Sequence, residues 1–178
     1  MALRVLERIP VPVPGDGAPG TLNVTYVKQE QDNWCWAACC QMVFGLLNFT
    51  VNGGALRQCD MASSQFNASC CNSPSSSVCD QGCWPENAYN FYGINFIKTN
   101  SALSPAGVKA EIDAGRPAEV YFAWTNGGAH VALVVGYYEN GDLEVYDPYY
   151  GPSRHAYSDL LSAYSMGSWT ISYSSLRI

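Results

Sequence analysis

The second half of the chain consists of long apolar runs separated by turn residues, a pattern typical of β-strands. Strands are predicted at 117–124, 130–139 and 142–150, and the second is almost wholly apolar, so we expect it to be buried. The Asn-Gly pair at 140–141 predicts a two-residue hairpin turn between the second and third strands. A last strand is predicted at 167–176, which completes an antiparallel sheet.

The first half shows the longer repeat of helices. Apolar residues recur every three or four positions over 35–47, which predicts a helix with Asn33 as its N-cap. Proline and glycine bracket two further helical segments, at 84–93 and 104–115, as they do at helix starts and ends. A short helix capped by Ser158 is expected just before the last strand.

The remaining segments set the domain organisation. Residues 1–20 are rich in proline and glycine and are expected to form an extended arm, followed by a short strand at 22–27. Residues 57–83 have few aliphatic side chains and many Ser, Asn and Cys, so we expect a loop-like insert held by disulfides. Residues 21–178 are expected to form one domain. Because helices precede the antiparallel sheet, the predicted fold class is α+β.

Composition narrows the possible partners. The chain is 48% hydrophobic and 13% charged, as in folded globular proteins. Its net charge of −6 argues against nucleic acid and anionic membranes, because both bind cationic surfaces. No apolar run approaches the roughly 18 residues of a membrane span, and the N-terminus shows no apolar signal-peptide region. We expect a monomer.

The eight cysteines favour an oxidising compartment, so we expect a secreted or exported protein. Up to three disulfides are predicted among six of them: Cys40, Cys59, Cys70, Cys71, Cys79 and Cys83. No metal is expected, because the chain has only two histidines and the cysteine spacings lack the paired CxxC of zinc ribbons. No cofactor is expected either.

Cys35 is the strongest candidate for chemistry. It begins the predicted helix at 35–47, and a helix N-terminus and a nearby imidazolium both favour the reactive thiolate. His130 opens a buried strand after a loop with two glycines, and Asp147 on the return strand is expected to orient the imidazole. With Asn-Gly as the turn, residue 151 faces His130, so side-chain reach or a bulge must bring Asp147 to it.

Three blocks of sequence resemble the papain-like cysteine peptidases. The closest likeness is to small bacterial members, which include effector proteases delivered into plant cells and bacteriocin-processing peptidases. The blocks are QEQDNWCWAA, GGAHVALVVGYYENGDLEVYDPYYG and the cysteine-bearing insert that starts near residue 57. The tail GSWTISY is also similar to those members.

The resemblance implies a papain-like fold, in which a helical half carries the nucleophile and packs on an antiparallel sheet half. It implies that Cys35 is the nucleophile, that His130 is the base that later protonates the leaving amine, and that Asp147 orients His130. The implied activity is hydrolysis of peptide bonds in a peptide or protein substrate through a thioester acyl-enzyme.

The resemblance also implies supporting roles. Gln29, six residues before the nucleophile, would donate a side-chain N–H to the oxyanion hole, and Gln31 competes with it for that role. Tyr149 would shield the His–Asp pair from water. The sequence departs from the family at Glu30, where papain often has glycine, and at Asp32, where the family has a cysteine. The first papain disulfide therefore cannot form here.

The other candidates have simpler expectations. Cys39 is expected to be a buried, unpaired residue, whereas Cys40 is a possible partner of Cys83. His155 is expected at the surface. The tryptophans that flank Cys35 are expected in the core and the cleft wall.

Two alternative functions stay open. A papain-like acyltransferase or deamidase, acting as a toxin or effector, would use the same residues with another acceptor or amide. A catalytically inactive, disulfide-stapled binding module would have Cys35 bridged to Cys39 or Cys40.

Overall fold

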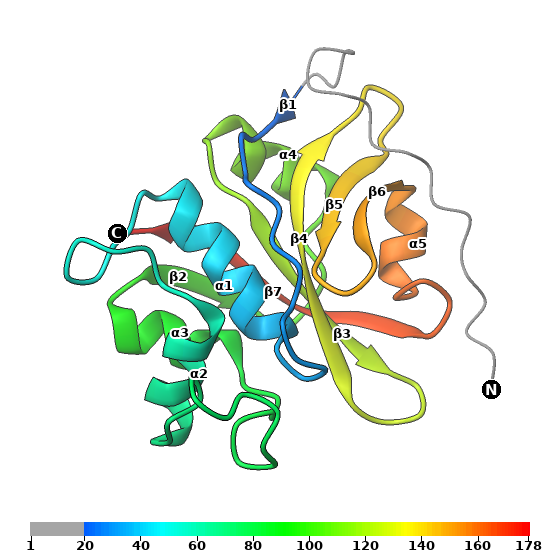
Figure 1. Cartoon of the computed structure of the whole chain (residues 1–178). Coiled ribbons are helices and arrows are strands. Elements are labelled where there is room, and N and C mark those ends of the chain that lie inside the picture. Colours follow the sequence, from blue (N-terminus) through cyan, green and yellow to red (C-terminus); the bar gives the residue numbers. More distant parts are fainter. Residues whose placement is uncertain (1–19) are drawn as a thin grey trace.

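The computed structural model describes residues 20–178, in which helices pack on both faces of a sheet (Figure 1). The arm expected at 1–20 lies outside the described residues, apart from Gly20. The helices are α1 (Cys35–Leu46), α2 (Gln58–Phe66), α3 (Pro85–Tyr92), α4 (Pro105–Asp113) and α5 (Tyr157–Leu161). The strands are β1 (Gly20–Thr21), β2 (Asn95–Thr99), β3 (Ala118–Trp124), β4 (Ala129–Tyr137), β5 (Leu143–Asp147), β6 (Gly151–His155) and β7 (Gly167–Arg177). Within residues 20–178, no helix has the length and apolar character needed to cross a membrane.

The strands form one antiparallel sheet in the order β2-β7-β3-β4-β5-β6, and β1 pairs with β4. β7, the last strand of the chain, lies between β2 and β3 and so joins the two halves of the molecule (Figure 1). The helices α1 to α3 come before most of the sheet in sequence. The predicted α+β class is therefore confirmed.

Strand β4 is buried on both sides, as its apolar sequence predicts. Val131, Leu133 and Val135 contribute to a core that includes α1, α2 and α3. Ala132 and Val134 contribute to a second core with α4 and α5. Because successive side chains of a strand point to opposite faces, this one strand supports both halves of the molecule.

Helix α1 begins at Cys35, but Asn33 is not its N-cap. The N-cap is Trp34, and no side chain caps the helix. Asn33 instead donates through Nδ2 to the backbone oxygen of Asp80 at 3.1 Å and to its carboxylate at 3.2 Å. The prediction was wrong because Asn33 forms hydrogen bonds with Asp80, a residue remote in sequence, instead of capping the helix. No capping side chain therefore accepts a hydrogen bond from the N–H groups in the first turn of α1.

The turn between β4 and β5 is not the predicted two-residue turn. Gly141 has a φ of 87° and donates to the oxygen of Tyr138 at 3.0 Å. The N–H of Tyr138 donates to the oxygen of Asp142 at 2.8 Å, so the loop has three residues and ends in a left-handed glycine.

A register shift between Val134 and Gly136 moves the pairing of β4 and β5 further. Val134 pairs with Val145 rather than with Asp147, as the simple hairpin count predicted. Together, the longer loop and this bulge bring Asp147 two positions closer to His130 along β4. A bulge was one of the two ways in which the sequence argument allowed these residues to meet.

Other element boundaries also differ from the predictions. The strand expected at 22–27 is not formed, and β1 lies just before that segment. The segment expected as one strand at 142–150 contains β5 and a turn, and β6 follows it. Strand β2 was not predicted. Helix α5 has Ala156 rather than Ser158 as its N-cap, and it ends before residues 163–165, all of which have positive φ.

The cysteine-rich segment is not entirely a loop, because α2 lies within it. Arg57 and Asp60 form a capping box at the start of this helix. The rest is held by two disulfides, Cys59–Cys71 and Cys70–Cys79. Cys40 and Cys83 are unpaired, so the third predicted disulfide is not formed.

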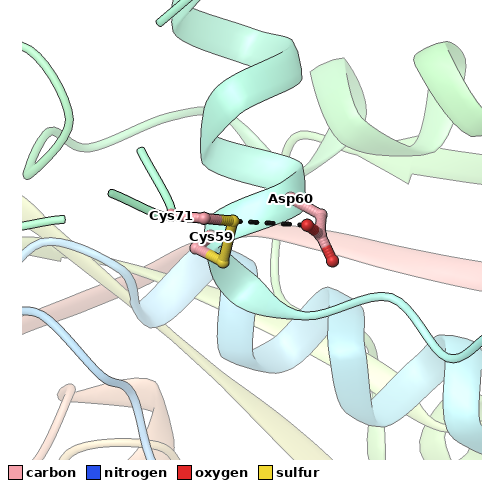
Figure 2. Close-up of side chains that lie close together, drawn as sticks. All are labelled: Cys59, Asp60 and Cys71. Carbon is pink, nitrogen blue, oxygen red and sulfur yellow. Dashed lines mark hydrogen bonds between the residues drawn. A yellow bond between two sulfur atoms is a disulfide. The ribbon is translucent and has the colours of Figure 1, made fainter. Parts of the chain in front are cut away.

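Figure 2 shows Cys59, Asp60 and Cys71 close together. They are the one group in residues 20–178 whose donor atoms lie close enough to hold a metal ion. The Asp60 carboxylate is 3.3 Å from the Cys71 sulfur, but both sulfurs belong to one disulfide. The group therefore lacks the thiolates that a metal would bind.

Replacing Cys70 and Cys79 together with alanine should lower the free energy of unfolding by about 2–3 kcal/mol. The bridge spans a sequence separation of 9, and its removal frees that loop in the unfolded chain. Urea unfolding under non-reducing conditions measures the loss. Cys83→Ala, which removes a half-buried cysteine without a bridge, is the control and should cost less than about 1 kcal/mol. Equal losses in the two variants would contradict a role for the disulfide.

Candidate active site

Two pockets meet at Cys35 and His130. The first, of 310 Å³, contains Asp32 and is called the Asp32 pocket; the second, of 460 Å³, contains Trp84 and is called the Trp84 pocket. Five residues line both: Asn33, Cys35, Gly82, Ala129 and His130. The two pockets thus form a cleft that extends to either side of Cys35 and His130.

Cys35 is a half-buried, unpaired cysteine in the first turn of α1. The tryptophans on either side of it are buried, and both donate to the cysteine-rich segment. Trp34 Nε1 donates to the oxygen of Cys79 at 2.7 Å, and Trp36 Nε1 donates to the oxygen of Gln81 at 3.1 Å. These bonds hold the start of α1, and thus Cys35, against residues 79–81, which begin at the Cys70–Cys79 disulfide.

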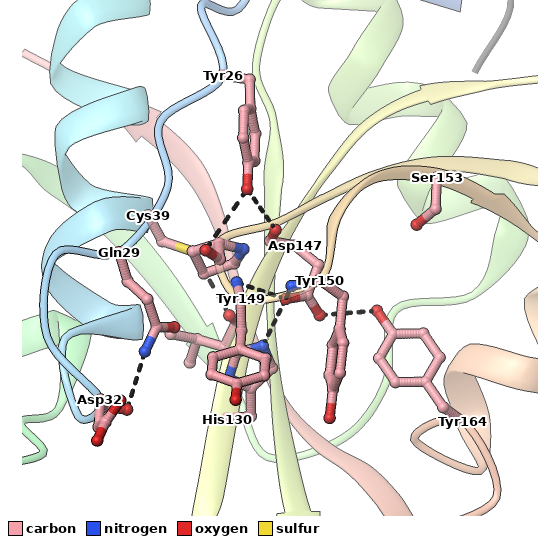
Figure 3. Close-up of polar contacts among 12 residues, drawn as sticks. Tyr26, Gln29, Asp32, Cys39, His130, Asp147, Tyr149, Tyr150, Ser153 and Tyr164 are labelled. Carbon is pink, nitrogen blue, oxygen red and sulfur yellow. Dashed lines mark hydrogen bonds and ion pairs between the residues drawn. The ribbon is translucent and has the colours of Figure 1, made fainter. Parts of the chain in front are cut away.

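His130 and Asp147 form a buried ion pair across the β4–β5 hairpin (Figure 3). His130 Nε2 lies 2.9 Å from Asp147 Oδ1. This bond leaves Nδ1 as the ring nitrogen available to Cys35, which lines both pockets together with His130 and contributes to raising the pKa of the imidazole. The imidazole is therefore bound to the carboxylate of Asp147 and lies in the cleft that Cys35 also lines.

Asp147 is fully buried, and its carboxylate is surrounded by donors. Oδ1 accepts the backbone N–H groups of Tyr149 and Tyr150, each at 2.9 Å, in addition to His130. Oδ2 accepts the hydroxyl of Tyr164 at 3.3 Å. Tyr164 was missed by the sequence analysis, because it reaches Asp147 only through the left-handed turn at 163–165.

The two partners shift each other's pKa. Burial lowers the pKa of His130, but the charge and hydrogen bond of Asp147, together with Cys35, raise it to about 10. Burial raises the pKa of Asp147, but the charge of His130 and the N–H donors lower it below its ordinary value. At neutral pH the pair is thus imidazolium and carboxylate.

Aromatic rings cover the imidazole. The ring of Trp124 stacks on His130 with a centroid distance of 5.9 Å, and Tyr150 contacts it edge-on at 6.2 Å. Tyr149, the residue expected as the shield, has half of its surface exposed and lines the Asp32 pocket. The rings that lie against His130 are therefore Trp124 and Tyr150. Trp124 was missed because it precedes His130 on a separate strand.

Gln29 lines the Asp32 pocket and is buried, whereas Gln31 lines neither pocket. The amide nitrogen of Gln29 donates to the backbone oxygens of Gln31 and Asp32, each at 2.8 Å. Its amide oxygen is buried without a hydrogen-bond partner among the described residues. In this conformation the side chain holds the turn before α1 together.

The remaining candidates lie away from the cleft, with one exception. His155 is buried rather than exposed, and its Nε2 lies 2.9 Å from Ser153 Oγ. Cys39 and Cys40 are buried and unpaired. Cys83 is also unpaired, and it lines the Trp84 pocket.

An unpaired cysteine in the first turn of a helix lines the same cleft as a His–Asp pair on an antiparallel sheet, and this combination is typical of the papain-like cysteine peptidases. The profile of the Peptidase_C39 like family matches residues 21–175, and the chain belongs to that family. The chain is thus a cysteine peptidase.

Solved structures with the same fold include a double glycine motif protease from an AMS/PCAT transporter, in complex with the leader peptide. It matches with a TM-score of 0.54 and 14% identity, over 91% of this chain and 97% of that chain.

Two further structures match at lower TM-scores. The peptidase domain of Streptococcus mutans ComA matches with a TM-score of 0.45 and 16% identity, over 83% of this chain and 95% of that chain. The Pseudomonas avirulence protein AvrPphB matches with a TM-score of 0.39 and 10% identity, over 87% of this chain and 98% of that chain. No curated protein matches the sequence at a significant level.

Asp147→Asn should lower the pKa of His130 from about 10, because the amide keeps the shape of the carboxylate but removes its charge. An NMR titration of the imidazole nitrogens measures the change. Asp142→Asn, which removes the partner of Arg154 on the same hairpin, is the matched control and should leave His130 unchanged. An unaltered pKa of His130 in Asp147→Asn would show that Asp147 is not the group that raises it.

The same shift has a consequence for stability. Because the folded-state pKa of His130 is raised from 6.5 to about 10, the protonated ring stabilises the fold fully below about pH 6.5. That contribution is lost as the pH rises through about 10, and it should be smaller in Asp147→Asn, in which Cys35 alone raises the pKa of His130.

Proposed function

We propose that this peptidase hydrolyses peptide bonds with Cys35 as nucleophile, His130 as general base and acid, and Asp147 as the residue that orients His130. The observation that carries the proposal is the position of the imidazole. Its Nε2 is bound to Asp147 at 2.9 Å, which leaves Nδ1 for the thiol of Cys35.

The reaction follows from this arrangement. The Cys35 thiolate attacks the carbonyl carbon of the scissile bond, and imidazolium His130 donates its proton to the departing amine. This leaves a thioester on Cys35. His130, now neutral, takes a proton from a water molecule that attacks the thioester. The acid product leaves, and the Cys35 thiolate that departs from it re-forms the ion pair with the imidazolium of His130.

The oxyanion that forms during attack needs N–H donors. The backbone N–H of Cys35 is available in the first turn of α1, which no side chain caps. Gln29 is the second donor in this proposal, since it lines the same pocket as Cys35. When substrate binds, the amide of Gln29 must then give up one of its hydrogen bonds to the backbone oxygens of Gln31 and Asp32 and donate to the oxyanion instead. Catalytic hydrogen bonds often form fully only in the complex with substrate.

The substrate and location are proposed on the same basis. A structural neighbour was solved in complex with a leader peptide, which supports a peptide as substrate here. Two disulfides support an oxidising compartment, and thus export. The inactive, stapled module lacks support, because its bridge from Cys35 is not formed.

Cys35→Ala should reduce peptidase activity on a casein digest by at least about 1,000-fold, because it removes the sulfur that forms the thioester in this mechanism. Its circular dichroism spectrum and melting temperature should match those of the wild type. Cys39→Ala, which removes a buried thiol one turn further along α1, is the control and should remain active. Full activity of Cys35→Ala would refute the proposal.

Alkylation tests the same site without a substrate. Iodoacetamide at mildly acidic pH should label Cys35 rapidly, and His130→Ala should abolish that rapid labelling, as read by peptide mass mapping. Product masses with and without an added amine distinguish hydrolysis from acyl transfer.

Gln29→Ala should lower kcat by about 100-fold with little change in KM, which is the size of effect that loss of one oxyanion donor has. Gln31→Ala removes the neighbouring amide, which lines neither pocket, and should have no such effect. Steady-state kinetics on one peptide cleaved by the wild type provides the comparison. Equal kcat values for Gln29→Ala and the wild type would remove Gln29 from the oxyanion hole.

A further inference from the structure

The two pockets that flank Cys35 differ in charge. Apart from Asn33 and His130, which line both pockets, the Trp84 pocket is lined by aromatic, small and aliphatic residues, and it contains no Asp, Glu, Lys or Arg. The Asp32 pocket contains one carboxylate, that of Asp32, and three aromatic residues, Trp124, Tyr149 and Tyr150. Because Cys35 and His130 line both pockets, Asp32 is the charged group that distinguishes them, and the cleft is more acidic on that side of the nucleophile.

Asp32 has no internal counter-ion. It is exposed, and its carboxylate makes no hydrogen bond or ion pair with any residue in the part of the chain from 20 to 178. Only its backbone oxygen is used, as an acceptor for Gln29. The nearby carboxylate of Asp80, in contrast, accepts the N–H and amide of Asn33. No lysine or arginine lines either pocket.

The opposite side of the Asp32 pocket is aromatic. Figure 3 shows Asp32 beside Gln29 in the segment before α1, and Tyr149 and Tyr150 on the side of the sheet. The two tyrosine rings pack edge-on with a centroid distance of 5.0 Å, and Tyr149 leaves half of its surface exposed. A cation in this pocket would gain from the carboxylate on one side and from an aromatic ring on the other.

We propose that the Asp32 pocket selects a substrate with a lysine or arginine side chain next to the scissile bond. This inference rests on the proposed function, because it assumes acylation of Cys35. An exposed ion pair and a cation–π contact together give a roughly three- to thirtyfold preference in kcat/KM over a neutral side chain. Asp32, which stands where the family has a cysteine, thus sets the preference for a cationic substrate side chain.

Thiol reagents of opposite charge test the pocket without any substrate. Cationic 2-aminoethyl and anionic 2-sulfonatoethyl methanethiosulfonate are reacted with the wild type, and the label on Cys35 is read by peptide mass mapping. The ratio of the cationic rate to the anionic rate should fall at least about threefold in Asp32→Lys, with a smaller fall in Asp32→Asn. Glu30→Lys is the matched control, because Glu30 is exposed, lies two residues away and lines neither pocket.

A peptide pool extends the test to catalysis. Sites cleaved by the wild type should be enriched in Lys or Arg within two residues of the scissile bond, on one side only. Asp32→Lys should lose that enrichment while still cleaving peptides, and Glu30→Lys should keep it.

The outcomes separate this inference from the proposed function. If Cys35 reacts and cleaves but neither the rate ratio nor the sequence preference depends on Asp32, the inference is overturned and the proposed function stands. If Cys35 does not react, or if Cys35→Ala cleaves the pool as well as the wild type does, the proposed function fails and the inference fails with it.

Discussion

Burial of the Asp147 carboxylate constrains the surrounding structure, because a charge without water must be paired and hydrogen-bonded. Its donors come from three elements: His130 at the start of β4, the N–H groups of Tyr149 and Tyr150 in the turn after β5, and Tyr164 before β7. Each of these elements contains an irregularity. The hairpin is shifted in register, the return strand is interrupted after β5, and residues 163–165 are left-handed. Such irregular backbone persists where contacts of this kind compensate for it.

The side of the cleft that carries Cys35, at the start of α1, is held by contacts with the cysteine-rich segment rather than by helix capping. Trp34, Trp36 and Asn33 all bond to residues 79–81, and Gly82 lines both pockets. The Cys70–Cys79 disulfide holds the segment that makes these contacts. A stretch with little core of its own thus positions the start of α1, where Cys35 lies, and its disulfides serve the site as well as stability.

The sequence was informative where a pattern of apolar positions extends over a whole helix or strand. The repeat of apolar positions located α1 and β4, and residue types in order along the chain brought out Cys35, His130 and Asp147. The register between β4 and β5, the partner of Asn33 and the contact of Tyr164 with Asp147 could not be predicted. Each is decided by tertiary contacts, and the register also by a glycine that takes a left-handed conformation in a three-residue loop. Local signals therefore brought out the candidate reacting groups but not the backbone that joins them.

Two buried carboxyl groups show how selectively the molecule places charge. Glu119 is as buried as Asp147, but it receives one hydrogen bond, from Tyr89, and its other oxygen has no partner among the described residues. Burial raises the pKa of Glu119 to about 8, so it is largely protonated at neutral pH. Asp147 differs in having a cationic partner and N–H donors, which keep its pKa low despite the same burial. The environment, not burial alone, thus determines that the carboxylate beside His130 is the one that carries charge.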